Sequence, residues 1–134
     1  MLEILDGPDQ IGGYKLSGTL TEEDFGRVVA DLEARLARHE KVGLVADLTG
    51  FHDVTVRAAL KDMRYGFGKI FEWNRFPREA VITDKRWLTS LVALAGPLVP
   101  FVELRTFAPG EEAAAFAWVA EAVPAGKPEK TNGT

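Results

Sequence analysis

One strand–loop–helix junction constrains the fold of this chain more than any other segment. Residues 42–47 (Val-Gly-Leu-Val-Ala-Asp) form a nearly continuous apolar run, which is typical of a strand covered on both faces. After a short loop, apolar side chains recur at helical spacing from Thr55 to Phe71. A buried strand followed by an amphipathic helix predicts an α/β fold, in which ligands usually bind at the carboxyl ends of the strands.

The rest of the chain repeats this alternation of strands and helices. We expect strands at 1–5, 11–17, 42–47, 79–83 and 102–107, and helices at 21–39, 55–71, 85–95 and 109–123. The order β-β-α-β-α-β-α-β-α predicts an α/β domain with a mostly parallel central sheet, an antiparallel N-terminal hairpin and flanking helices. This single domain spans residues 1–123, and we expect the polar tail 124–134 to be disordered.

Composition narrows the class of protein. A formal net charge of −4 disfavours a nucleic acid partner, and the absence of cysteine excludes disulfides, thiolate zinc sites and a cysteine nucleophile. The start of the chain lacks the features of a signal peptide. Residues 87–102 carry no charge, but this run is shorter than the roughly 20 residues of a membrane span, and Gly96, Pro97 and Pro100 interrupt it. We therefore expect a cytoplasmic protein that is not integral to a membrane.

Four segments, taken in order, resemble the SpoIIAA-like proteins of the STAS (STAS/CRAL-TRIO-like) superfamily. They are 17–25 (SGTLTEEDF), 45–51 (VADLTGF), 80–87 (AVITDKRW), and Arg105-Thr-Phe107 followed by Trp118. The likeness covers about residues 1–123. It implies a SpoIIAA-like (STAS-type) fold and a mostly non-enzymatic family of anti-sigma-factor antagonists, transporter modules and small-ligand sensors.

The resemblance also implies where a regulatory switch would lie. Antagonists of the SpoIIAA type carry a phosphorylated serine in an Asp-Ser-Ser-Gly stretch that starts the helix after the third strand. Here the matching residues 55–58 are Thr-Val-Arg-Ala, so the serine is absent and Arg57 lies near its place. This departure argues against a kinase-operated switch. The likeness to CRAL-TRIO folds implies hydrophobic-ligand binding instead.

Several residues at the junction admit a functional and a structural interpretation. Asp47 and Asp84 both end strands, so they could share one rim and hold a cation or a phosphoryl group, or they could cap turns. His52, next to an aspartate, could act as a base or lie in a solvated loop. Thr49 and Thr55 could be phosphorylated or could cap the helix. No nucleophile–base set or metal-ligand spacing is evident, so we predict no catalytic residue, metal or cofactor.

Charge and aromatic residues gather in the middle of the chain. Residues 57–86 hold eight basic and four acidic side chains, within an otherwise acidic sequence. Such a segment suits an anionic headgroup or an acidic partner, or is simply a solvated helix face. Residues 71–76 hold three aromatic rings, which could cover the core or form a homodimer contact.

These observations favour a non-catalytic binding module. The first hypothesis is a hydrophobic or amphiphilic, lipid-like ligand held in a pocket lined by the helices 55–71 and 85–95, beneath Met63, Phe67 and Trp87. The second is a regulatory protein partner of the anti-sigma-factor-antagonist type, bound by the loop 49–57. The predicted ligand-binding or partner-binding residues are Asp47, Thr49, His52, Thr55, Arg57, Lys61, Arg64, Trp73 and Trp87.

Overall fold

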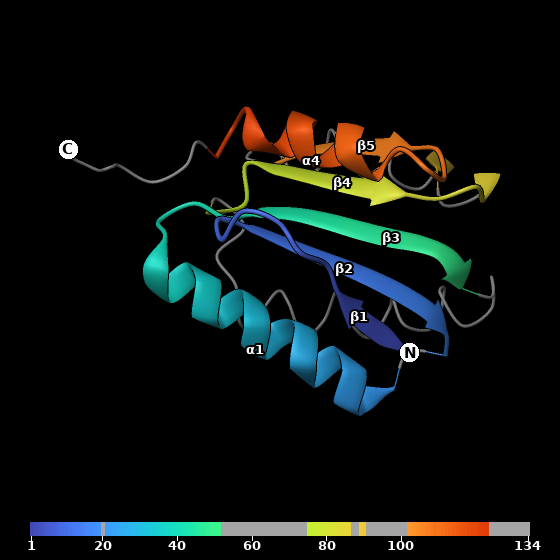
Figure 1. The fold of residues 1–134 in the computed structure, drawn as a ribbon, viewed down its shortest axis with the longest axis horizontal. Helices are drawn as coiled ribbons and strands as arrows, with labels where there is room; N and C mark the ends of the chain where they lie inside the picture. Colours follow the sequence, from blue (N-terminus) through green and yellow to red (C-terminus); the bar gives the residue numbers. More distant parts are fainter. Residues whose placement is uncertain (20, 52–74, 87–88, 91–101, 124–134) are drawn as a thin grey trace.

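A single sheet organises the part of the chain that the computed structural model describes, which is residues 1–19, 21–51, 75–86, 89–90 and 102–123. Among these residues the sheet has five strands in the order β1-β2-β3-β4-β5 (Figure 1). The strands are β1 (Leu2–Ile4), β2 (Ile11–Gly18), β3 (Gly43–Phe51), β4 (Arg78–Ile82) and β5 (Glu103–Phe107). Helix α1 (Glu22–Arg38) lies beside β1 and β2, and α4 (Glu112–Ala120) lies near β4.

The sheet has the mixed topology predicted from the sequence. β1 and β2 form an antiparallel hairpin in which Leu2 is opposite Leu16 and Ile4 is opposite Tyr14. The pairs β2–β3, β3–β4 and β4–β5 are all parallel. The carboxyl ends of four neighbouring strands therefore meet at one edge of the sheet, where polar residues of different strands can act together.

The two faces of the sheet bury separate apolar clusters. Alternate residues of β3 point to opposite faces, so Leu48 packs with the α1 cluster and Val45 with the α4 cluster. The α1 cluster also contains Leu2, Tyr14, Leu16, Val28, Leu32, Val42 and Phe76; the α4 cluster contains Ile11, Ala80, Ile82, Phe107, Ala115, Val119 and Val123. The structure is thus a three-layer arrangement of helix, sheet and helix.

Close packing of α4 depends on one glycine. A Cβ atom built on Gly43 would overlap the side chain of Val119, so the helix can approach β3 only because this position has no side chain. Any larger residue there would push α4 away from the sheet.

Helix α1 begins where the sequence predicts. The Thr21 hydroxyl accepts a hydrogen bond from the Asp24 amide at 3.0 Å, and the Asp24 carboxylate accepts one from the Thr21 amide at 3.3 Å. This reciprocal capping satisfies two amide groups that the first turn leaves without partners.

Arg75 closes the other end of α1. Its guanidinium donates to the carbonyls of Leu36 (2.8 Å), His39 (2.9 Å) and Glu40 (2.9 Å), and its own carbonyl accepts from the Val42 amide at 2.9 Å. The residue that leads toward β4 is therefore fixed against the end of α1 and the start of β3.

The structure corrects three predicted boundaries. β3 does not end at residue 47 but continues to Phe51: two β3 residues, Leu48 and Thr49, lie opposite the single β2 residue Leu16, and beyond this bulge Ser17 and Gly18 pair with Gly50 and Phe51. The last helix is shorter than 109–123, since Gly110 adopts a positive φ of 89° in a turn before it and residues 121–122 form a turn after it.

Other predictions are tested only in part. Phe76 is 3% exposed and packs in the α1 cluster, so this ring covers the core, as one of the two interpretations held. Arg86, Thr89 and Ser90 are helical, while the rest of the predicted helix 85–95, the helix 55–71 and the tail 124–134 lie outside the described residues. In the described part of the chain, no helix is long and apolar enough to cross a membrane.

Candidate functional site

Only two of the predicted site residues, Asp47 and Thr49, have a described position. The other seven lie outside the described residues: His52, Thr55, Arg57, Lys61, Arg64, Trp73 and Trp87. The helix segment around Met63 and Phe67, beneath which a pocket is expected, lies outside them as well. The site is therefore built from the strand ends that the structure does describe.

Asp47 lies in the second half of β3, paired with Lys15 of β2 and Ile82 of β4, and is 8% exposed. Its carboxylate accepts a hydrogen bond from the Thr49 amide at 3.1 Å. A carboxylate that bonds the backbone two residues ahead shapes the local chain. This hydrogen bond to the Thr49 amide supports the structural interpretation, in which Asp47 caps a turn.

The neighbouring strand supplies a cation to the same edge of the sheet. Lys85 follows β4, and its ammonium group donates to the Thr49 carbonyl at 3.3 Å and lies 3.5 Å from the Asp84 carboxylate. Its amide donates to the Thr83 hydroxyl at 3.1 Å, which turns the chain after the strand. Lys85 is therefore directed across to β3, and only 15% of its side chain is exposed.

The side-chain hydroxyl of Thr49 has no hydrogen-bond partner among the described residues, although its oxygen atom is buried. A buried polar group without a partner costs about 1–3 kcal/mol, so proteins seldom keep one. The edge formed by Asp47, Thr49, Thr83 and Lys85, which we call the carboxyl-end rim, thus combines a fixed cation with an unsatisfied hydroxyl.

A second unusual polar group lies on the face of the sheet. Glu79 of β4 is paired with Leu44 and Leu104 and is 9% exposed. No hydrogen bond joins its carboxyl group to any residue in the described ranges. Burial raises its pKa from an ordinary 4.5 to about 7, because the charged form loses its hydration. Below that pH the carboxyl group is mostly neutral and can donate a hydrogen bond.

Comparison with known proteins identifies the family. A family model described as SpoIIAA-like matches residues 11–120, which is most of the chain. The chain belongs to the SpoIIAA-like family. The match confirms the resemblance read from the four sequence segments, and with it the expectation of a STAS-like α/β module.

A solved structure supports the fold of this SpoIIAA-like protein. It is the crystal structure of an uncharacterized protein with a SpoIIAA-like fold from Shewanella loihica PV-4, with a TM-score of 0.62 and 23% sequence identity. The match covers 89% of this chain and 92% of that one. At this identity the likeness shows the shared fold alone. No curated protein matches the chain significantly.

In this SpoIIAA-like domain, a charge network joins the connection before β2 to the end of α1. Asp9, in the β1–β2 connection, accepts from Arg38 at 2.7 and 2.8 Å and contacts His39 Nε2 at 2.7 Å. Arg35 donates to the Asp9 carbonyl at 3.0 Å and to the Asp31 carboxylate at 2.8 Å, which also accepts from the Tyr14 hydroxyl. These contacts tie α1 to β2 and hold His39 in a structural role.

Sequence reasoning missed two of these groups. The sequence predicts Glu79 only as the first residue of a strand, although a charged residue beside the apolar Ala-Val-Ile run is a signal of a buried carboxyl. It predicts Lys85 only as the start of a helix within a basic segment, although Lys85 lies two residues after the predicted strand 79–83. Among the described residues, no cluster of three potential metal ligands is present.

Proposed function

We propose that this SpoIIAA-like domain is a non-catalytic binding module for a hydrophobic or amphiphilic small molecule. The observation that carries the proposal is Glu79, a buried carboxyl group on an apolar sheet face. Leu44 lies opposite it on β3, and the next pair on this face is Ala46 with Val81. Ligand pockets in proteins are mainly apolar and hold a few polar groups that fix the orientation of the ligand. Glu79 is a group of that kind.

The chemistry of Glu79 favours an amphiphile over a plain hydrocarbon. At pH values below its pKa of about 7 the carboxyl group is mostly neutral, so no net charge has to be buried. A neutral acid can donate a hydrogen bond to a hydroxyl or carbonyl oxygen of the ligand. Such a ligand supplies the partner that the described residues do not supply, while its chain packs on the apolar side chains.

The first experiment is native mass spectrometry of the purified full-length chain. We expect an added mass of a few hundred daltons that organic extraction removes. The emptied protein should then bind the fluorescent fatty acid analogue 11-(dansylamino)undecanoic acid at pH 6, and 1-dodecanol should displace it. A protein with no added mass and no binding of the probe would contradict the proposal.

Matched variants test the role assigned to Glu79. Glu79→Leu removes the buried carboxyl group, and we expect dodecanol to compete about tenfold less well, the value of one hydrogen bond of roughly 1.4 kcal/mol. Glu103→Gln changes an exposed carboxylate on the other face of the sheet and should leave competition unchanged. Equal competition by dodecanol in all three proteins would remove Glu79 from the site.

The alternative function is a regulatory protein partner of the anti-sigma-factor-antagonist type, bound without the usual phosphoserine. Its support is the carboxyl-end rim, where Lys85 and the exposed Asp84 adjoin β3. In this case, the tagged chain should co-purify with a defined protein partner, and the Thr55→Glu variant should no longer bind that partner. A partner retained by Thr55→Glu would contradict a threonine switch.

We further infer that the domain acts without catalysis, in the cytoplasm, and as a homodimer. Within the described residues, no serine or threonine hydroxyl is hydrogen-bonded to a histidine or a carboxylate, the arrangement that activates a nucleophile. Cell fractionation of the tagged protein would test the location.

A further inference from the structure

Strand β5 lies at one edge of the sheet formed by the described strands, where it pairs only with β4. The Glu103 amide donates to the Pro77 carbonyl at 2.9 Å, and the Phe107 carbonyl accepts from the Thr83 amide at 3.0 Å. In a parallel pair each residue directs both backbone groups to one side, so alternate residues of β5 face β4. The amide and carbonyl groups of Leu104 and Thr106 therefore point away from the sheet.

Helix α4 leaves part of β5 exposed on its own face of the sheet. It packs mainly against β4, β3 and β2 and reaches β5 at Phe107, whose ring centroid lies 5.9 Å from that of Trp118, while Glu103 and Arg105 stay exposed. The strand at the other edge, β1, is shorter, with three residues. An edge strand with unpaired backbone groups is a template for another strand, and natural proteins usually place charges there to prevent unwanted pairing.

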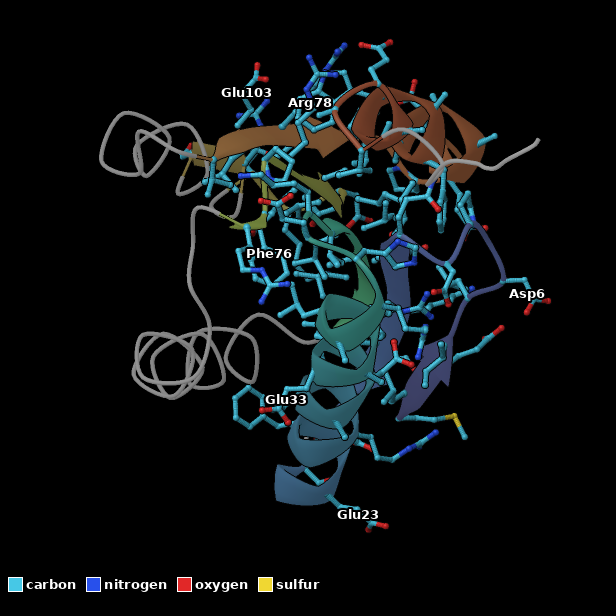
Figure 2. The ribbon with its side chains drawn as sticks, turned by 90° about the vertical axis from the view of Figure 1, so that its left-hand side faces the viewer. Asp6, Glu23, Glu33, Phe76, Arg78 and Glu103 are labelled. Carbon is cyan, nitrogen blue, oxygen red and sulfur yellow. The ribbon has the colours of Figure 1, made fainter. Side chains whose placement is uncertain are left out.

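The charges on β5 alternate in sign along one face. Glu103 and Arg105 are two residues apart and both exposed. Arg105 has no carboxylate partner among the described residues; its guanidinium lies 5.0 Å from the Phe107 ring centroid and 5.8 Å from that of Trp118. Glu103 accepts from Arg78 at 3.0 Å, and Figure 2 shows the two side chains together at the edge of the sheet.

This pattern is complementary to itself. In an antiparallel pair of two β5 strands centred on Leu104, Glu103 of each copy lies opposite Arg105 of the other. Two such ion pairs form at positions where Cβ atoms are about 5 Å apart. Leu104 meets Leu104 in a hydrogen-bonded pair on the two-fold axis, and an isologous contact of this kind closes as a dimer.

The neighbouring register is disfavoured. Centring the pair on Arg105 places two guanidinium groups opposite each other and sets Glu103 against Phe107. An acidic peptide is a poorer occupant too, because a carboxylate that meets Arg105 brings negative charge near Glu103. The two charges thus discriminate against both alternatives.

We propose that β5 is the homodimer interface of this protein, and that a second copy docks antiparallel along it with Leu104 on the two-fold axis. The five described strands of each copy then form one continuous sheet. The proposal is independent of the ligand-binding function, since Glu103 and Arg105 lie on the face opposite Glu79.

Sedimentation velocity of the full-length chain tests the assembly. We expect a concentration-dependent dimer that Arg105→Glu weakens at least tenfold, because two carboxylates then face each other across the axis. The charge swap Glu103→Arg with Arg105→Glu restores the complementarity and should recover the dimer. Circular dichroism confirms that each variant is folded. A chain that stays monomeric at millimolar concentration would overturn the proposal.

Single cysteines test the register, because the chain has no cysteine of its own. Leu104→Cys should form a disulfide-linked dimer under mild oxidation, since Cα atoms of a hydrogen-bonded antiparallel pair lie about 5.5 Å apart. Thr106→Cys is the matched control, because its symmetry mate lies four positions away, roughly 13 Å. Equal cross-linking of both variants, or none by Leu104→Cys, would overturn the register.

Discussion

Asp9 and Glu79 show two opposite ways in which this protein holds a carboxyl group. Asp9 is half exposed and receives hydrogen bonds from Arg38 and His39, which hold its pKa well below its ordinary value. Glu79 is buried without a partner in the described part of the chain, and its pKa is raised to about 7. The first carboxylate stabilises the fold in its charged form, and the second destabilises the fold when it becomes charged.

The groups that stabilise the fold and the groups that are available to bind a ligand therefore lie in different parts of the molecule. The Asp9 network ties the connection β1–β2 to the end of α1, and its donors and acceptors satisfy each other. Glu79 and Thr49 each retain a hydrogen-bonding group that the described residues leave without a partner. A protein keeps such groups when something else binds them, so each of these two separate positions is a place where a ligand should be sought.

The largest expected effect is the pH dependence caused by Glu79. Because its folded pKa of about 7 exceeds the ordinary 4.5, the folded state binds the proton more tightly than the unfolded state. The free energy of unfolding should therefore fall as pH rises from about 4.5 to 7, by about 3 kcal/mol in total. Urea denaturation at a series of pH values measures this change.

Glu79→Leu is the control for that titration. It should remove the loss between pH 4.5 and 7 and make the protein more stable than the wild type at pH 8. A wild-type protein equally stable at pH 5 and pH 8 would show that Glu79 finds a partner in its charged form.

Asp31→Ala should give the next largest effect. The substitution removes the acceptor shared by the Tyr14 hydroxyl and Arg35, which are both partly or fully buried. We expect the free energy of unfolding to fall by about 2 kcal/mol, measured by urea denaturation at pH 7. Asp84→Ala, at an exposed ion pair, is the control and should change it by less than about 0.5 kcal/mol. Similar losses in both variants would show that the Asp31 network stabilises the fold no more than the exposed ion pair of Asp84.

Asp9→Asn should have a smaller effect with the opposite pH dependence to Glu79. Since the folded pKa of Asp9 is depressed below its ordinary 3.8, its contribution is present above that value and is lost as pH falls. Solvent screens this half-exposed group, so we expect a loss of about 1 kcal/mol at pH 7 and a clearly smaller loss at pH 2, where part of the contribution has gone. Thermal unfolding at the two pH values provides the measurement, and an equal loss at both would contradict the assignment.

Thr49→Val should have the smallest effect, and its sign is the informative part. The variant replaces a buried hydroxyl that has no described partner with a methyl group of similar size. We expect unchanged stability or a gain of up to about 1 kcal/mol in the free energy of unfolding. Thr83→Val, which removes the acceptor for the Lys85 amide, should instead destabilise the protein. Destabilisation by Thr49→Val would show that its hydroxyl is bonded.

Local signals made much of this fold predictable. Thr21 and Asp24 marked the start of α1 because the cap uses only residues of one turn. The strand–helix alternation gave the sheet topology because parallel neighbours need crossover connections. The extension of β3 to Phe51 was not predictable, since the bulge at Leu48 and Thr49 is defined by pairing with β2, more than thirty residues earlier in the chain.

The candidate site was less predictable than the fold. Asp47 and Thr49 stood out as polar residues after an apolar run, and the bond between them is local, but the contact of the Thr49 carbonyl depends on Lys85, which is distant in the sequence. The burial of Glu79 is a tertiary property, because the same residue on an edge strand would be hydrated. The apolar Ala-Val-Ile run beside Glu79 favours burial, but the local sequence does not determine whether the strand is central or at an edge of the sheet.

The bonds of Arg75 have a consequence for the order of folding. They join residues 35 to 39 positions apart, so forming them closes a long loop whose entropic cost grows with its length. Helix α1 and the hairpin depend on shorter separations and can form earlier. Arg75 should therefore bind to the end of α1 only after that helix exists, and β4 would then join a template that β2, α1 and β3 have already assembled.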